Sequence, residues 1–498
     1  MSASASIVTR ALAPAPPRAG EPGFDVRHPA LVTLAGLVFG SLVVGVGTTR
    51  GPAAGLAAVL AVAAVLWAVR NPVRGAIAVV AIVPVVSGLR RGLPIPGFRL
   101  GELLAVGYAA LLLATASGSH WRRWRAFDWV ALAYVVATFA LGLYDTYARG
   151  DDLSGNDLGQ LIGPLQFFLL YRAVLVALPR RTDRLRALDW LLRGSIAVSV
   201  LTYAQAARIP GVNELLVSLT GQDYSGRLAW AVPRANGPFP HWTMLAGYMF
   251  AIVLLCVALL LGGASGRRRR LVLVTLVTSA ITLILTVTIA PMLGALCGAL
   301  ALAWWYRRSG RALAYVAVGG AIAAIAFQPL LARRTDDQFA SASSSSQSYS
   351  LVPHTVSSRI GFWTDQYLPA MRGRWLTGYG PQIPPDVTWK YTESVYIGLL
   401  LRGGLPLLAL YGLMTWALLL GALEVARRPA RPADPARAGP RADAEERGLE
   451  RALARGTIVL LGVLAVIQVI APLFLTTGLP HVWWILAAFV LGAAADRR

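Results

Sequence analysis

The chain has 498 residues, of which 56% are hydrophobic and only 14% charged, and its mean hydropathy is +0.59. A water-soluble protein of this size needs a far more polar surface, so the composition excludes a soluble globular protein and indicates lipid as the solvent. The net charge of +22 does not indicate nucleic-acid binding, because the positive residues are scattered between apolar stretches and form no compact basic domain.

The apolar stretches predict an all-α, polytopic integral membrane protein with about 12 to 14 transmembrane helices. Each stretch must be helical, because its backbone groups have no water to bond inside a bilayer. In chain order, the expected spans are 30–48, 52–69, 73–89, 101–117, 127–144, 158–178, 187–207, 243–262, 271–288, 290–306, 312–330, 394–424, 456–475 and 480–495.

The spans divide the chain into membrane-embedded groups and polar segments. The expected order is a flexible cytoplasmic tail (1–29), N-terminal transmembrane helices (30–207), an extracytoplasmic segment (208–242), middle transmembrane helices (243–330), a large, partly helical extracytoplasmic loop (331–393), a re-entry and transmembrane helix (394–424), a disordered cytoplasmic loop (425–455) and a C-terminal transmembrane hairpin (456–498). The first residues lack the apolar core and cleavage site of a signal peptide.

Arginine distribution predicts that both termini are cytoplasmic. With the N-terminus inside, the arginine-rich loops fall on the cytoplasmic side, as the positive-inside rule requires. These loops contain Arg70 and Arg74, Arg122 to Arg125, Arg180 to Arg186, Arg267 to Arg270, Arg307 to Arg311, and residues 427–455. Arg90, Arg91 and Arg99 fall outside, and one miscounted span among the first four would account for them.

Neither metal chemistry nor a cofactor is expected. Cys256 and Cys297 both fall inside apolar spans, which favours small core residues over a disulfide or thiolate site. His241 and His354 have no neighbours at metal-ligand spacing. The sequence also lacks a P-loop, a G-x-G-x-x-G element, a nucleophile elbow and an H-E-x-x-H motif, which argues against nucleotide-driven or soluble-type hydrolytic mechanisms.

Arg234 lies in a Gly/Pro-rich stretch just outside the span that begins near residue 243. The positive-inside rule does not explain an arginine there. A guanidinium at the outer membrane surface binds phosphate with two hydrogen bonds, so Arg234 is a candidate diphosphate-binding residue. Contact with ordinary lipid headgroups is the alternative.

The second half of the segment 331–393 is dense in aromatic residues, arginines and turn glycines, so we expect it to fold over the membrane. Ser357-Ser358 before an apolar run predicts a capped helix with Arg359 near its start. A positive side chain there opposes the helix dipole unless an anion is bound, which makes Arg359 a candidate anion ligand. Snorkelling, or pairing with Asp365, is an equally good interpretation.

Glu393 lies where this loop re-enters the membrane, between Tyr391 and Tyr396. A partly desolvated carboxylate at this position suits general-base catalysis, although a helix-start residue that stabilises the dipole is equally consistent. Arg402 lies deeper and is followed by Gly403-Gly404. An arginine at that depth needs a partner or a water-filled cavity and is a functional candidate by default.

These features together resemble the O-antigen ligase and Wzy-type polymerase superfamily of bacterial membrane glycosyltransferases, over about residues 230 to 424. The resemblance rests on the order of several elements. They are Arg234-Ala-Asn-Gly237-Pro-Phe239 before a span, two spans, a long outer loop with Arg359, Trp363 and Leu376-Thr-Gly378-Tyr-Gly380, a polar pair, a hydrophobic re-entry and glycines.

The sequence departs from the family pattern at two places. Glu393-Ser394 stands where ligases typically carry a His-Asn pair, and Thr288-Ile289-Ala290-Pro291 stands where many members carry a Ser-Arg pair. The departures favour a polymerase or ligase of a surface polysaccharide or exopolysaccharide over a lipid A core ligase.

The resemblance implies transfer of a glycan from an undecaprenyl-diphosphate donor to an acceptor sugar hydroxyl, on the outer face of the bacterial cytoplasmic (inner) membrane and without nucleotide or metal. The implied partners are this lipid-linked donor, a glycan or glycolipid acceptor, membrane lipid and other polysaccharide assembly proteins, with no nucleic acid. The expected roles are catalytic base for Glu393, diphosphate binding for Arg234, Arg359 and Arg402, and sugar stacking for Trp363 and Tyr379.

Two other classes of protein fit parts of the pattern. A flippase for lipid-linked oligosaccharides also needs many spans, but it predicts arginines lining the middle of the membrane, whereas the spans here are nearly free of charge at their centres. A scaffold for a polysaccharide assembly complex would use the structured half of the outer loop as a docking surface, and it leaves Arg402 without a purpose.

Overall fold

The computed structural model describes residues 71–90, 99–115, 124–222, 234–306, 354–382, 392–428 and 440–495, with isolated positions at 63–64, 67–68, 327–329, 332, 384 and 387–388. Every regular element among these residues is a helix, which confirms the all-α polytopic membrane fold. Among them, five helices are long and apolar enough to cross a membrane: Ala126–Ala148, Asp157–Ala177, Trp242–Leu261, Ile289–Tyr306 and Val395–Ala426.

The complete set of described helices includes these five and others that are shorter, less apolar or lie across the bundle. In chain order the structure contains α4 (Pro72–Val86), α5 (Leu100–Thr115), α7 (Ala126–Ala148), α8 (Gly155–Ala177), α9 (Arg181–Ala206), α10 (Val212–Thr220), α12 (Trp242–Leu261), α13 (Gly266–Leu285), α14 (Ile289–Tyr306), α17 (His354–Phe362), the π-helix η1 (Trp363–Tyr367), α18 (Leu368–Ala370), α19 (Val395–Ala426), α20 (Pro440–Ile467), the 3₁₀ turn η2 (Leu473–Leu475) and α21 (Leu479–Ala495).

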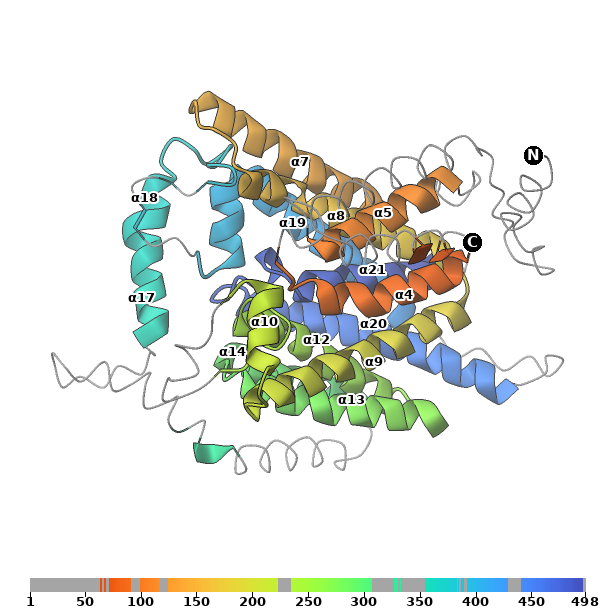
Figure 1. The fold of residues 1–498 in the computed structure, drawn as a ribbon. Coiled ribbons are helices and arrows are strands. Elements are labelled where there is room, and N and C mark those ends of the chain that lie inside the picture. Colours follow the sequence, from red (N-terminus) through yellow and green to blue (C-terminus); the bar gives the residue numbers. More distant parts are fainter. Residues whose placement is uncertain are drawn as a thin grey trace, which may run out of the picture.

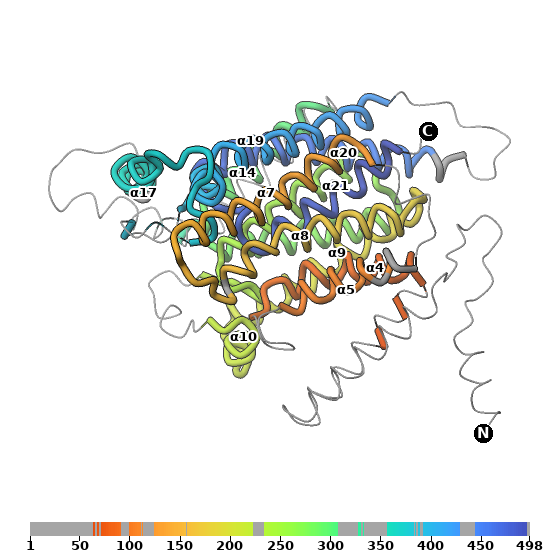
Figure 2. Tube along the Cα trace, turned by 90° about the horizontal axis from the view of Figure 1, so that it is seen from above, coloured from red at the N-terminus to blue at the C-terminus, as the bar shows by residue number. Residues whose placement is uncertain are grey.

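Two helices form the centre of the bundle. α12 is apolar on all sides, and nearly all of its residues are buried against α13, α14, α20 and α21. α21 is buried from Leu479 to Ala494, and it packs against α8, α19 and α12. A helix that is hydrophobic all round is either buried in a core or exposed to lipid. These two are buried, and the long helices run alongside them in both views (Figures 1 and 2).

α17, η1 and α18 form one helical segment that lies across an end of the bundle (Figures 1 and 2). We call this the α17 end, and we call the end near the C-terminus the opposite end. Arg359 lies in the last turn of α17, not near its start, so the predicted conflict with the helix dipole is wrong. The helix is already formed at His354, five residues before Arg359.

α19 is broken near its start. Gly403 and Gly404 have non-helical backbone angles, with φ +64° at Gly404. The chain segment 375–379 fills the break, because the Leu405 amide donates to the Trp375 carbonyl (2.7 Å) and the Tyr379 amide donates to the Leu401 carbonyl. We call this contact the α19 break.

The glycines of the Gly378-Tyr-Gly380 turn make this approach possible. A Cβ atom at Gly378 would lie 2.6 Å from the Leu401 carbonyl oxygen, and one at Gly380 would lie 2.9 Å from that of Gly142 on α7. Both glycines also have positive φ, at +77° and +69°. The turn is therefore wedged between α19 and α7, and only glycine fits at these two positions.

Ion pairs between helices tie the opposite end together. Glu450 of α20 accepts from Arg181 and Arg184 of α9, both at 2.7 Å. Arg268 of α13 forms a two-point pair with Asp189 of α9 at 2.9 and 3.0 Å. Bidentate arginine pairs of this kind fix the relative orientation of the helices that carry them.

The helices agree in position with the expected spans from 73–89 onwards, with two exceptions around α20. This helix begins at Pro440, so the segment 425–455 is not a disordered loop throughout, and it ends at Ile467 instead of continuing to 475. Residues 444–455 are rich in Ala, Glu and Arg, which form helices well without being apolar. The expected spans 30–48 and 312–330 and most of 52–69 lie outside the described residues.

Candidate active site at the α17 end

Arg359 and Glu393 form an ion pair at the α17 end. The Arg359 Nη2 atom lies 2.9 Å from Glu393 Oε2, and the side chains are 27% and 26% exposed. The second terminal nitrogen of Arg359 donates to the carbonyl of Ile470, which follows α20, at 2.7 Å. One guanidinium therefore connects α17, the start of α19 and the end of α20, and solvent still reaches the pair.

Glu393 has an unusual backbone conformation. Its φ is +52°, in the left-handed region that a residue with a side chain seldom adopts. The next residue, Ser394, is the N-cap of α19, and its hydroxyl accepts from the Ile397 amide. Glu393 is therefore not the capping residue, and the strained backbone directs its side chain toward Arg359 instead.

Two aromatic residues of η1 support this pair. The indole N–H of Trp363 donates to the Thr392 carbonyl at 3.1 Å, which anchors the residue before Glu393. Tyr367 is buried, and this burial together with the Glu393 charge raises the pKa of Tyr367 to about 12. The Tyr367 hydroxyl is therefore neutral at physiological pH, and sequence reasoning missed it because η1 is recognisable only in the folded chain.

Arg402 lies immediately before the α19 break. Its side chain is partly exposed, and within the described part of the chain it makes no hydrogen bond or ion pair. Among the described residues, the N–H donors of the Arg402 guanidinium are therefore not used, and they lie at the side of the loop that is embedded in the membrane.

Tyr379 belongs to a second polar group at the α17 end. Its ring lies beneath two guanidinium groups, with Arg374 at 4.8 Å and Arg149 at 5.5 Å from the ring centroid. Arg374 also contacts Asp145 of α7 at 3.4 Å. Asp145 is 1% exposed, and its Oδ2 atom has no hydrogen-bond partner in the described structure.

Arg234 belongs to a third group, at the start of α12. Its guanidinium lies 4.9 Å from the centre of the Trp242 ring, on which the His241 ring also stacks. The following turn is held by Gln205 of α9, which forms two hydrogen bonds with the buried Asn236 and accepts a third from the Gly237 amide. The Arg-x-x-Gly-x-Phe element therefore forms a buried turn, and this turn fixes the position of the Arg234 backbone.

Of the site residues predicted from the sequence, the structure brings three together: Arg359, Glu393 and Trp363. It places Tyr379 and Arg402 on the two sides of the α19 break and Arg234 in a separate turn. Asp145, Arg149 and Arg374 were missed, because their association with Tyr379 depends on packing between α7 and the loop. The α17 end thus combines a carboxylate, several arginines and partly exposed aromatic rings, the groups needed to bind an anion and accept a proton.

Comparison with known proteins identifies one family. A family model described as O-antigen ligase matches residues 274–412. This stretch begins within α13 and ends within α19, so it contains Arg359, Trp363, Tyr379, Glu393 and Arg402 but not Arg234. A search of curated proteins found no match.

Proposed function

We propose, from the premise that this chain carries a domain of the O-antigen ligase and Wzy-type polymerase superfamily, that it transfers a glycan from a polyprenyl-diphosphate donor to a sugar hydroxyl. The product is a surface polysaccharide or exopolysaccharide, and the α17 end faces the outside of the bacterial cytoplasmic membrane. The observation that carries the proposal is the Arg359–Glu393 pair, which lies within the matched domain and remains open to solvent.

The ion pair is the resting state of the site in this proposal. A diphosphate carries more negative charge than a carboxylate, so it draws the Arg359 guanidinium away from Glu393. Among the described residues the Arg402 side chain has no hydrogen-bond partner, and Arg234 lies on another part of the same end, so both are candidates to bind the same diphosphate. Binding of the donor then leaves Glu393 without its cation, which makes the carboxylate a better base.

The transfer step requires no nucleotide. The acceptor hydroxyl oxygen attacks the anomeric carbon of the donor sugar and forms the new glycosidic bond. The bond from that carbon to the diphosphate breaks, and the leaving group keeps the electron pair while arginines neutralise its charge. The proton of the hydroxyl passes to the Glu393 carboxylate. The partly exposed ring of Trp363 is the better candidate for a sugar contact, because two guanidinium groups already contact Tyr379.

Gene deletion in the host, followed by electrophoresis of surface glycans and lipid-linked intermediates, tests the proposal. Wild type, Arg234→Ala and Glu393→Gln are returned to the deletion strain at equal protein level. We expect Glu393→Gln to lower polymer output by about 100-fold or more, as for loss of a general base. Glu214→Gln is the matched control, because Glu214 is an exposed glutamate of α10 at the same end.

The intermediates distinguish the possible activities. Single lipid-linked repeats that accumulate on the outer face identify a polymerase, and long lipid-linked chains left unattached identify a ligase. Accumulation on the cytoplasmic face would contradict the proposal and indicate a flippase. Full polymer output from Glu393→Gln would show that this carboxylate is not the base.

A further inference from the structure

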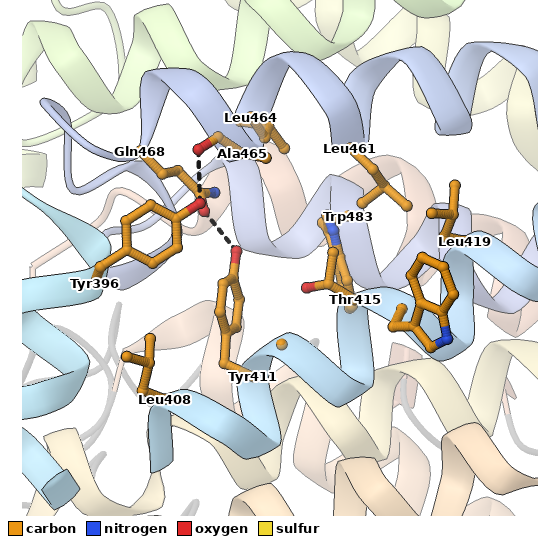
Figure 3. A pocket seen from close by; sticks show the side chains of 12 residues that line it. Tyr396, Leu408, Tyr411, Thr415, Leu419, Leu461, Leu464, Ala465, Gln468 and Trp483 are labelled. Carbon is orange, nitrogen blue, oxygen red and sulfur yellow. Dashed lines mark hydrogen bonds between the residues drawn. The ribbon is translucent and has the colours of Figure 1, made fainter. Parts of the chain in front are cut away.

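A cavity of about 340 Å³ lies between α19, α20 and α21, apart from the residues assigned to the transfer step. Side chains of α19 and α20 face each other across it, and Trp483 of α21 closes its far side (Figure 3). Most of the lining is apolar, including Leu408, Leu419 and Leu461. Leu408 and Leu419 are about 17 Å apart along a helix that rises 1.5 Å per residue, so the cavity is elongated along α19.

Three polar groups of this cavity, those of Tyr396, Tyr411 and Gln468, lie toward its α17 end, and the hydroxyl of Thr415 lies one turn further along α19. Tyr396 donates to the Ala465 carbonyl at 2.7 Å, and Tyr411 donates to the Gln468 side-chain carbonyl. Gln468 is only 1% exposed, yet its amide nitrogen has no hydrogen-bond partner in the described structure. A buried donor of this kind costs free energy unless a ligand supplies an acceptor, so the polar end is fitted to an oxygen-bearing group.

Hydrogen bonds of the segment 468–470 link the polar end of the cavity to the Arg359–Glu393 pair. The Gln468 carbonyl accepts from the Val395 amide at 3.0 Å, two residues after Glu393. The Ile470 carbonyl, two residues after Gln468, accepts from Arg359. A molecule with its charged group at the ion pair therefore meets the polar end of the cavity first and the apolar part beyond it.

The outer faces beside the cavity are apolar and exposed. Leu413 and Trp416 of α19 are 53% and 56% exposed, and Val466 of α20 is 71% exposed. In a membrane protein such faces contact lipid chains, so the cavity is accessible sideways from the bilayer. These observations describe a site for an amphiphile with a long apolar chain and a polar group at the α17 end.

We propose that the cavity between α19 and α20 holds the first isoprene units of the donor's polyprenyl chain, next to its diphosphate. This assignment rests on the proposed function, and it adds the site that selects the lipid carrier. The chain enters between α19 and α20, and the Gln468 amide donates to an oxygen of the head group. Bound in this way, the donor presents its diphosphate to Arg359.

Gly412 provides a test of this site, because it lines the cavity and a Cβ atom there would meet nothing within 4 Å. Gly412→Leu therefore fills the cavity without a backbone clash. Gly462→Leu on α20 is the matched control, since Gly462 also has open space but does not line the cavity. Binding of undecaprenyl diphosphate to the full-length proteins in nanodiscs is measured, and thermal unfolding verifies that both variants are folded.

We expect Gly412→Leu to raise the Kd at least tenfold and Gly462→Leu to change it less than twofold. A photoactivatable undecaprenyl diphosphate should crosslink wild-type protein within 408–419 or 461–468, a result that does not depend on any variant. Unchanged binding by Gly412→Leu, or crosslinks only elsewhere, would overturn the proposal. Equal displacement of the probe by phosphatidylglycerol would also overturn it, because the cavity would then accept any lipid chain.

The two proposals fail separately in these experiments. Crosslinking in the cavity combined with full polymer output from Glu393→Gln would remove the assigned chemistry and keep the lipid site. Normal binding by Gly412→Leu combined with an inactive Glu393→Gln would remove the lipid site and keep the chemistry.

Discussion

Glu393 has φ +52°, in the left-handed region of backbone conformation that residues with a side chain seldom adopt. Such strain costs about 1 to 3 kcal/mol and persists only where the surrounding structure imposes it. Here Trp363 holds the preceding carbonyl and Ser394 caps the following helix. The strained residue is also the one that carries the carboxylate of the ion pair, which is the pattern expected at a functional position.

A pair of substitutions at Glu393 separates strain from chemistry. Glu393→Ala removes the carboxylate and keeps the strain, whereas Glu393→Gly removes both. We expect Glu393→Gly to be more stable than Glu393→Ala by about 1 kcal/mol in thermal unfolding in detergent. Both variants should lose polymer output in cells. A Glu393→Gly protein that keeps its output would show that position 393 serves the backbone alone.

Tyr367 predicts a pH dependence of stability. Its pKa is raised to about 12, above the value near 10 of an unfolded chain, by burial and by the Glu393 charge. The folded state therefore keeps the proton that the unfolded state releases, so this contribution is complete below pH 10 and is lost as pH rises through 12. We expect the unfolding temperature of Tyr367→Phe to fall less steeply than that of wild type between pH 9 and 11. Parallel curves would contradict this role for Tyr367.

At the scale of elements, the α19 break determines how the loop sits on the bundle. Gly404 has φ +64°, and a Cβ atom there would lie 2.4 Å from the Trp375 carbonyl oxygen. The next nearest atoms are the backbone carbon and oxygen of Leu376, and backbone cannot move aside as a flexible side chain does. The break also begins one residue after Arg402, so its geometry controls the position of that cation.

Gly404→Ala should therefore disturb both stability and function. We expect a loss of about 2 kcal/mol or more from the combined clash and backbone strain, together with reduced polymer output. Gly462→Ala is the control, because it lies in a helix with open space around it and should be neutral or stabilising by about 0.5 to 1 kcal/mol. Thermal unfolding and glycan electrophoresis measure the two effects, and equal behaviour of the variants would refute a special role for the break.

At the scale of the whole molecule, charge differs between the two ends. Arginines of α9, α13 and α20 gather at the opposite end, where Glu450 and Asp189 pair with several of them. The α17 end also carries arginines, and two of them, Arg359 and Arg374, pair with Glu393 and with the buried Asp145. From the positive-inside rule we expect the opposite end to face the cytoplasm, as the proposed outward-facing site requires.

Cysteine labelling tests this orientation. In a Cys297→Ser background, which removes the exposed native thiol and leaves the buried Cys256, single cysteines replace Arg372 at the α17 end and Arg186 at the opposite end. Both side chains are exposed. A membrane-impermeant maleimide should label position 372 in intact spheroplasts and position 186 only after lysis. The reverse pattern would invert the topology and move the site to the cytoplasm.

Local sequence determined the helical architecture and part of the site. Hydropathy over about 20 residues locates a membrane helix, because the bilayer fixes the length that must be apolar. Glu393 was predicted from its position at the membrane re-entry, Arg359 from the helix expected in the outer loop and Trp363 from the family resemblance, and the three lie together in the structure. The starts of α17 and α20 differ from the prediction, because Ser357-Ser358 lie inside α17 and do not cap it, and because the Glu- and Arg-rich residues 444–455 form a helix without being apolar.

Only the tertiary structure decided which of these residues meet. The partners of Arg359 are Glu393 and the Ile470 carbonyl, far apart in sequence, and Asp145 of α7 meets Arg374 of the loop. The Gln468 amide nitrogen, which has no hydrogen-bond partner in the described structure, likewise became a candidate ligand-binding group only because Gln468 lines the cavity between α19 and α20. Hydropathy and capping are local properties of the chain, whereas these contacts depend on how helices pack and break, which no stretch of sequence specifies alone.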